Sequence, residues 1–126
     1  MDDRAAYAAV IGKLILTLRT MRGMNQESLA VRASLSQSAL SRFENGQTLP
    51  DAFELRKVAE ALGYKPEQLV TMIEQAFART RDAAKNVKKA TPWVDIAVAG
   101  AFAGLAVGVI ASLLNEAEQK NGRKKP

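Results

Sequence analysis

The chain has 126 residues, enough for one small domain with additional segments, and it contains neither cysteine nor histidine. Disulfides and thiolate metal sites are therefore excluded, and the side chain most often used as general base and metal ligand is missing. The net charge of +5 comes wholly from residues 77–126, because residues 1–76 hold nine basic and nine acidic side chains. Bulk charge thus gives no support to nucleic-acid binding by the first part, whereas the second part suits an anionic membrane surface.

Five short helices are predicted for the first part of the chain, because apolar residues recur at three- and four-residue steps and no segment alternates as a strand would. The segments are residues 5–22, 26–33 and 37–44, a fourth from 49–51 to Leu62, and a fifth that begins at Pro66. Their ends are Gly23, Asn45, Gly46 and Gly63, and the predicted N-caps are Asn25 and Ser36. The apolar faces are Val10, Ile11, Leu14, Ile15, Leu18 and Met21, then Leu55, Val58, Ala59 and Leu62, then Leu69, Val70, Ile73 and Phe77. We expect a compact all-α domain at residues 1–78.

The second and third helices have the form of a helix-turn-helix, in which the second helix of the pair enters the major groove of DNA. Ala30 is small where the two helices must cross, Leu35 lies in the turn, and Leu40 and Phe43 give the later helix a buried face. The opposite face carries hydrogen-bonding side chains suited to base edges and phosphates, namely Gln37, Ser38, Ser41 and Arg42.

The runs 18–30 and 36–46, followed by Pro50, resemble the Cro/C1 (XRE) family of helix-turn-helix regulators, and the resemblance covers about residues 9–76. It implies a five-helix, lambda-repressor-like fold that binds double-stranded DNA without a cofactor. It also implies that Arg19 and Glu44 form a structural ion pair. The residues that the resemblance assigns to DNA are Gln26, Ser36, Gln37, Ser38, Ser41, Arg42, Asn45 and Gly46.

The same resemblance implies a role for most of these residues. Gln26 touches a phosphate and braces the first recognition residue, while Gln37 and Ser38 read bases. Ser41 and Arg42 contact bases or backbone, and the amides of Asn45 and Gly46 approach phosphate. The following loop, residues 47–50, contains no cation, so minor-groove contacts from it are not expected.

Two alternatives remain for the polar face of residues 37–42. It could be a solvated surface, or it could bind a protein, as in the bacterial rod-shape adaptor family of membrane-bound helix-turn-helix proteins. The neutral charge of residues 1–76 fits a membrane-anchored adaptor. DNA binding would instead be favoured if Arg22, Arg32 and Arg42 gathered on one side.

The remaining chain is predicted as a basic linker or helix extension at residues 79–92, a hydrophobic helix at 93–114 and a polar, basic tail at 115–126. The hydrophobic helix has 22 residues with Asp95 as its single charge. At about 1.5 Å per residue it reaches about 33 Å, enough for a hydrocarbon core of about 30 Å. It is apolar all round, which favours a transmembrane anchor; the alternative is a buried oligomerisation helix of a soluble repressor.

Small residues form a stripe along this helix at every fourth position: Gly100, Gly104, Gly108 and Ser112. In lipid such a stripe lets two helices pack closely, so we expect a homodimer or higher homo-oligomer. The segment from Pro92 resembles the glycine-zipper anchors of small ribosome-associated inner-membrane proteins of bacteria. The acidic start of the chain does not read as a cleaved signal. The predicted location is the bacterial inner membrane, with a single span and the first domain in the cytoplasm; the alternative is a cytoplasmic protein.

Catalytic constellations are not visible in the sequence. There is no nucleophile paired with a base, no metal-ligand cluster and no phosphate-binding loop. We therefore expect a protein that is not an enzyme and that needs neither a cofactor nor a metal.

Overall fold

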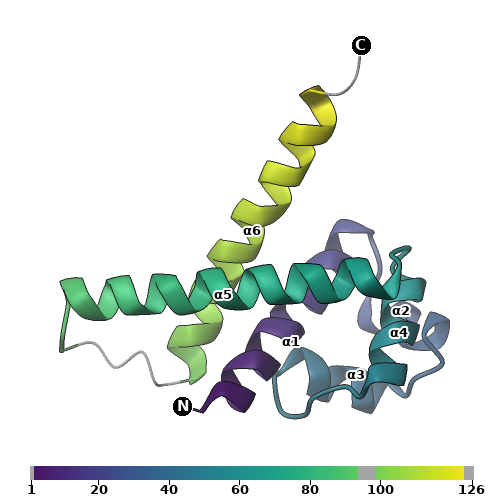
Figure 1. Ribbon diagram of the computed structural model, residues 1–126. Helices are drawn as coiled ribbons and strands as arrows, with labels where there is room; N and C mark the ends of the chain where they lie inside the picture. The colour runs from purple at the N-terminus through teal and green to yellow at the C-terminus, as the bar shows by residue number, and fades with distance from the viewer. Residues whose placement is uncertain (1, 94–98, 124–126) are drawn as a thin grey trace.

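The computed structural model describes residues 2–93 and 99–123, and these form six helices and no strand. The helices are α1 (Asp3–Met21), α2 (Gln26–Arg32), α3 (Gln37–Glu44), α4 (Ala52–Ala61), α5 (Pro66–Ala90) and α6 (Ala99–Arg123). Figure 1 shows the short helices α2, α3 and α4 grouped at one end of α5, while α6 crosses α5 and extends away from the rest. The predicted all-α class, a helix-turn-helix domain followed by a long apolar helix, is confirmed.

The helix ends are set by the residues that the sequence marks. The side chain of Asn25 accepts a hydrogen bond from the Ser28 amide at 2.8 Å, and the Ser36 hydroxyl oxygen accepts one from the Ala39 amide at 3.1 Å. Both side chains satisfy amides that have no partner within their own helix. Gly23 ends α1 with a φ of 70°, a conformation that residues with a Cβ rarely adopt.

The core forms around α1, which packs against α3, α5 and α6. The fully buried large side chains are Val10, Leu14, Ile15 and Leu18 of α1, Leu29 and Leu40 of the helix pair, and Val58, Leu62, Leu69, Ile73, Thr80 and Ile110 beyond it. Met21 and Val70, predicted on apolar faces, are exposed instead. Met21 is the last residue of α1, and Val70 lines an open groove between α4 and α5.

The basic segment after residue 78 is helical, because α5 runs without interruption to Ala90. Residues 79–92 were predicted to be either a linker or an extension of the fifth helix, and residues 79–90 form the helix extension. Thr80 is fully buried within it, and its hydroxyl donates a hydrogen bond of 2.6 Å to the carbonyl of Ala76. α5 thus provides a long surface on which a further helix can pack.

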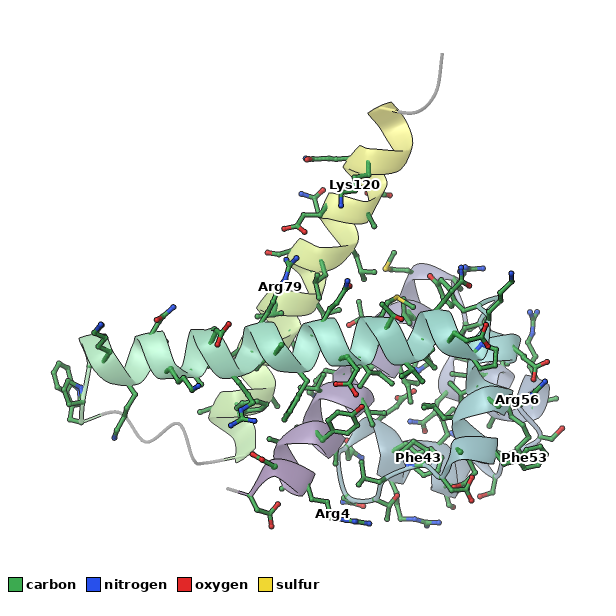
Figure 2. The ribbon with its side chains drawn as sticks, viewed as in Figure 1. Arg4, Phe43, Phe53, Arg56, Arg79 and Lys120 are labelled. Atoms are coloured by element: carbon green, nitrogen blue, oxygen red, sulfur yellow. The ribbon has the colours of Figure 1, made fainter. Side chains whose placement is uncertain are left out.

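α6 packs on α1 and α5 through one row of side chains. Phe102, Ala106 and Ile110, spaced by four residues, are buried in this contact. Near the far end, Arg79 of α5 donates two hydrogen bonds to the Glu116 carboxylate, at 3.0 and 3.1 Å. In Figure 2, Arg79 extends from α5 toward α6. The helix continues beyond residue 114 to Arg123, into the part predicted as a tail, whereas Asp95 lies outside the described residues.

Three glycines of α6 face open space. A Cβ added at Gly100, Gly104 or Gly108 would meet no atom within 4 Å, apart from the helix itself. Among the described residues, one helical segment, Gly100–Lys120, is long and apolar enough to cross a membrane by length and composition. Only 17% of its most apolar window is buried, whereas the central helix of a soluble core is mostly buried. α6 therefore has one packed row and a wide exposed apolar surface.

Candidate nucleic-acid interface

The turn between α2 and α3 is fixed by backbone hydrogen bonds. The Ala33 amide donates to the Leu29 carbonyl, and the Leu35 amide donates to the Ala30 carbonyl, both at 2.9 Å. Ser34 takes a positive φ of 53° at the corner, and its carbonyl accepts a hydrogen bond of 3.3 Å from the Lys57 ammonium of α4. This lysine contact ties the turn to the next helix, and it was not predicted from the sequence.

α3 presents a polar face to solvent, as the spacing of its residues predicts. Leu40 and Phe43 are buried, and Figure 2 shows Phe43 among the packed helices. The side chains of the opposite face are exposed at Gln37, Ser38 and Arg42 and half-buried at Ser41. Ser36 is exposed, but its hydroxyl oxygen is already used as the N-cap acceptor. The face assigned to DNA is therefore open to a ligand.

An ion pair anchors the end of α3 to α1. The Arg19 guanidinium donates from Nε to Glu44 Oε2 at 2.7 Å and from Nη2 to Oε1 at 3.0 Å. Its Nη1 also donates to the Met24 carbonyl at 3.2 Å. The Glu44 side chain is only 5% exposed. The hydrogen bond with Glu44 raises the pKa of Arg19 above its usual value; partial burial opposes this, and the charge of Glu44 adds to it. This pair matches the structural role that the resemblance implies.

The ion pair is linked to the recognition face by two amide side chains. Gln26 Nε2 donates to Glu44 Oε1 at 3.1 Å, and Gln37 Nε2 donates to Gln26 Oε1 at 3.3 Å. Gln37, the first residue of α3, is thus oriented by contacts that lead back to a buried carboxylate. A pre-positioned side chain loses less conformational entropy when it binds.

The first three amides after α3 are bonded within the fold. The amides of Asn45, Gly46 and Gln47 donate to carbonyls of Ser41, Phe43 and Arg42 at distances from 2.9 to 3.1 Å. The Asn45 side-chain amide lies 3.4 Å from the Ser41 hydroxyl oxygen. Side chains are therefore the donors to look for at this position.

Comparison with known proteins identifies this arrangement. Residues 15–69 match the helix-turn-helix family, and a curated relative, the uncharacterized HTH-type transcriptional regulator y4dJ of Sinorhizobium fredii, is 33% identical over 72 residues. The match covers 57% of this chain and 94% of the relative. The chain belongs to the Cro/C1 (XRE) helix-turn-helix family. No solved structure matches it.

The arginines of this helix-turn-helix domain do not all serve one surface. Arg22 lies over the ring of Tyr64, 5.0 Å from its centroid, at the loop before α5. That contact directs Arg22 to the α4–α5 connection, whereas Arg42 remains exposed on α3. Among residues 2–93 and 99–123, no group of three acidic side chains is arranged to hold a metal ion.

Proposed function

We propose that this helix-turn-helix protein is a sequence-specific DNA-binding transcription regulator. The observation that carries the proposal is α3, whose polar face is open to solvent while its first residue is held by Gln26 and Glu44. Family membership and the name of the relative support it. Gln37 and Ser38 would read base edges, and Ser41 and Arg42 bases or backbone.

Phosphate contacts complete the proposed interface. Gln26 lies at the first turn of α2, where its side chain can contact a phosphate while it braces Gln37. Asn45 follows α3 directly, beside the backbone that borders the groove, where its side-chain amide can donate to a phosphate; the Gly46 amide is bonded to the Phe43 carbonyl and is not offered. Because one recognition helix covers only a few base pairs, we propose that two copies bind a roughly palindromic site.

We also propose that α6 tethers the protein to the bacterial inner membrane, with the helix-turn-helix domain in the cytoplasm. The length of α6 and its largely exposed apolar surface support this. The open row of Gly100, Gly104, Gly108 and Ser112 would let two spans pack together. Insertion into a membrane requires α6 to separate from the domain, because Phe102, Ala106 and Ile110 would have to leave their contact with α1 and α5. Recovery of the full chain in the soluble fraction, without detergent, would end the tether proposal.

DNA binding is tested with the full chain, because α6 covers part of α1. Bound sequences are selected from a random duplex pool, and the affinity for the enriched site is then measured over a range of salt concentrations. Phosphate neutralisation predicts a steep loss of affinity with salt. Replacement of Arg42 by alanine should cost about 1–3 kcal/mol at the enriched site if Arg42 reads a base. An unchanged affinity and specificity would remove Arg42 from the interface.

The second candidate is a membrane-anchored adaptor that binds a protein through the same face. The neutral charge of residues 1–76 favours it, because bulk attraction to DNA is then weak. The selection experiment separates the two functions. Absent or salt-insensitive binding to duplex DNA would reject the regulator and favour the adaptor.

A further inference from the structure

A cleft separates the first turn of α1 from the loop that follows the recognition helix. Its volume is about 470 Å³, and it is lined by Asp2, Arg4, Ala5 and Ala8 on one side and by residues 46–49 on the other. The alanines leave the space between Arg4 and the loop unfilled. In Figure 2, Arg4 extends from α1 at the edge of the molecule, away from α5.

The loop and α1 are held at a fixed separation. Gly46 has a φ of 70°, and a Cβ at this position would lie 3.3 Å from the Ala9 Cα of α1. A Cβ on Gly12 would overlap the carbonyl oxygens of Phe43 and Glu44. α1 therefore passes in close contact with both the end of α3 and the loop. Arg4 is carried by the same rigid helix, so its position relative to the recognition helix is set by the fold.

The charge of Arg4 is available, although two acids precede it. The Asp2 carboxylate accepts a hydrogen bond of 2.7 Å from the Ala5 amide as the N-cap of α1. The Asp3 carboxylate lies 3.7 Å from the guanidinium of Arg81. Within residues 2–93 and 99–123, Arg4 itself makes no ion pair. The loop 46–49 contributes no cation to the cleft.

We propose that Arg4 binds a phosphate of the DNA backbone beside the end of the recognition helix, supplying the positive charge that residues 45–50 lack. The inference rests on the proposed DNA-binding function. With α3 in the major groove, the loop after it lies along the backbone that borders the groove. The amides of Asn45, Gly46 and Gln47 are already bonded within the fold, and residues 46–49 carry no positive charge to offer a phosphate. Arg4 is the charged donor that faces this position, and it binds without regard to sequence.

The experiment measures binding of the full chain to its selected site and to random duplex at several salt concentrations. For each bound copy, Arg4→Ala should lower both affinities by about fivefold near physiological salt and reduce the slope of log K against log salt by about 0.9. The ratio of the two affinities should not change. Arg4→Lys should keep the slope, because it keeps the charge. Arg56→Ala is the matched control, since Arg56 is an exposed arginine of α4 that pairs with Glu60.

The outcomes distinguish a failure of the Arg4 contact from a failure of DNA binding itself. If the wild-type chain shows no salt-dependent DNA binding, the proposed function fails and Arg4 has no phosphate to bind. If wild type binds and Arg4→Ala keeps the full salt slope, Arg4 is not a phosphate contact. A change in the specificity ratio would also overturn the inference, because it would make Arg4 a base contact. The substitution leaves α1 intact, because alanine has a high helix propensity and because a positive charge in the first turn interacts unfavourably with the helix dipole.

Discussion

Replacement of Glu44 by glutamine tests whether the fold depends on the charge at the end of α3. The shape of the side chain is kept, but Arg19, which is 15% exposed, loses its counter-ion. Breaking a fully buried pair by removing one partner costs about 3–5 kcal/mol. Because Arg19 keeps some contact with water and its hydrogen bond to the Met24 carbonyl, we expect about 2–3 kcal/mol. In a domain of this size that loss lowers Tm by roughly 10–20 °C.

The assay is thermal and urea unfolding of the full chain, followed by circular dichroism at neutral pH. Glu60→Gln is the matched control, because the Arg56–Glu60 pair is 62% and 59% exposed and should contribute no more than about 0.5 kcal/mol. A double-mutant cycle with Arg19→Met isolates the coupling between the two charges. Equal losses for Glu44→Gln and Glu60→Gln would refute the view that the buried pair stabilises the fold.

Further substitutions test the packing and the pH dependence. Gly12→Ala should destabilise the fold by about 1–3 kcal/mol in urea unfolding, because its Cβ would overlap backbone oxygens of α3. Gly104→Ala should not destabilise it, since its Cβ would meet nothing within 4 Å. Ile110→Ala should cost about 2–5 kcal/mol in the same assay; no loss would mean that α6 does not pack on α1 in solution. Burial and the hydrogen bond to Glu74 raise the pKa of Tyr7 from 10.0 to about 12, so its stabilising contribution is complete below pH 10.0 and is lost as pH rises through about 12. Tyr7→Phe should remove this alkaline loss in unfolding curves, and an unchanged curve would refute it.

The helix-turn-helix pair was predictable from local chemistry. Asn25 and Ser36 cap α2 and α3 because a short polar side chain at these positions satisfies a free amide, an effect that depends on three neighbouring residues. Such signals need no knowledge of the rest of the chain. The exposure of Gln37 and Arg42 followed from the helical spacing of Leu40 and Phe43 for the same reason.

The packing of α6 was not predictable in this way. Phe102, Ala106 and Ile110 are buried, but the other faces of the helix are also apolar, so no polar face marks which row turns inward. The proposed contact between Arg4 and a phosphate could not be predicted from the sequence for a related reason. It depends on the close approach of α1 to the loop after α3, across more than 40 residues of sequence, and spacing along the chain carries no information about it.

The contact between α6 and α1 sets how the protein can be divided. Leu14 of α1 and Ile110 of α6 line the same small apolar pocket. A chain cut after the helix-turn-helix match at residue 69, or at the end of α5, would therefore expose this apolar side of α1 to water. Such fragments should unfold at a lower temperature and aggregate. As long as α6 is packed on α1, we expect the helix-turn-helix domain and α6 to unfold as one cooperative unit in water, and family boundaries alone do not mark where this protein can be trimmed.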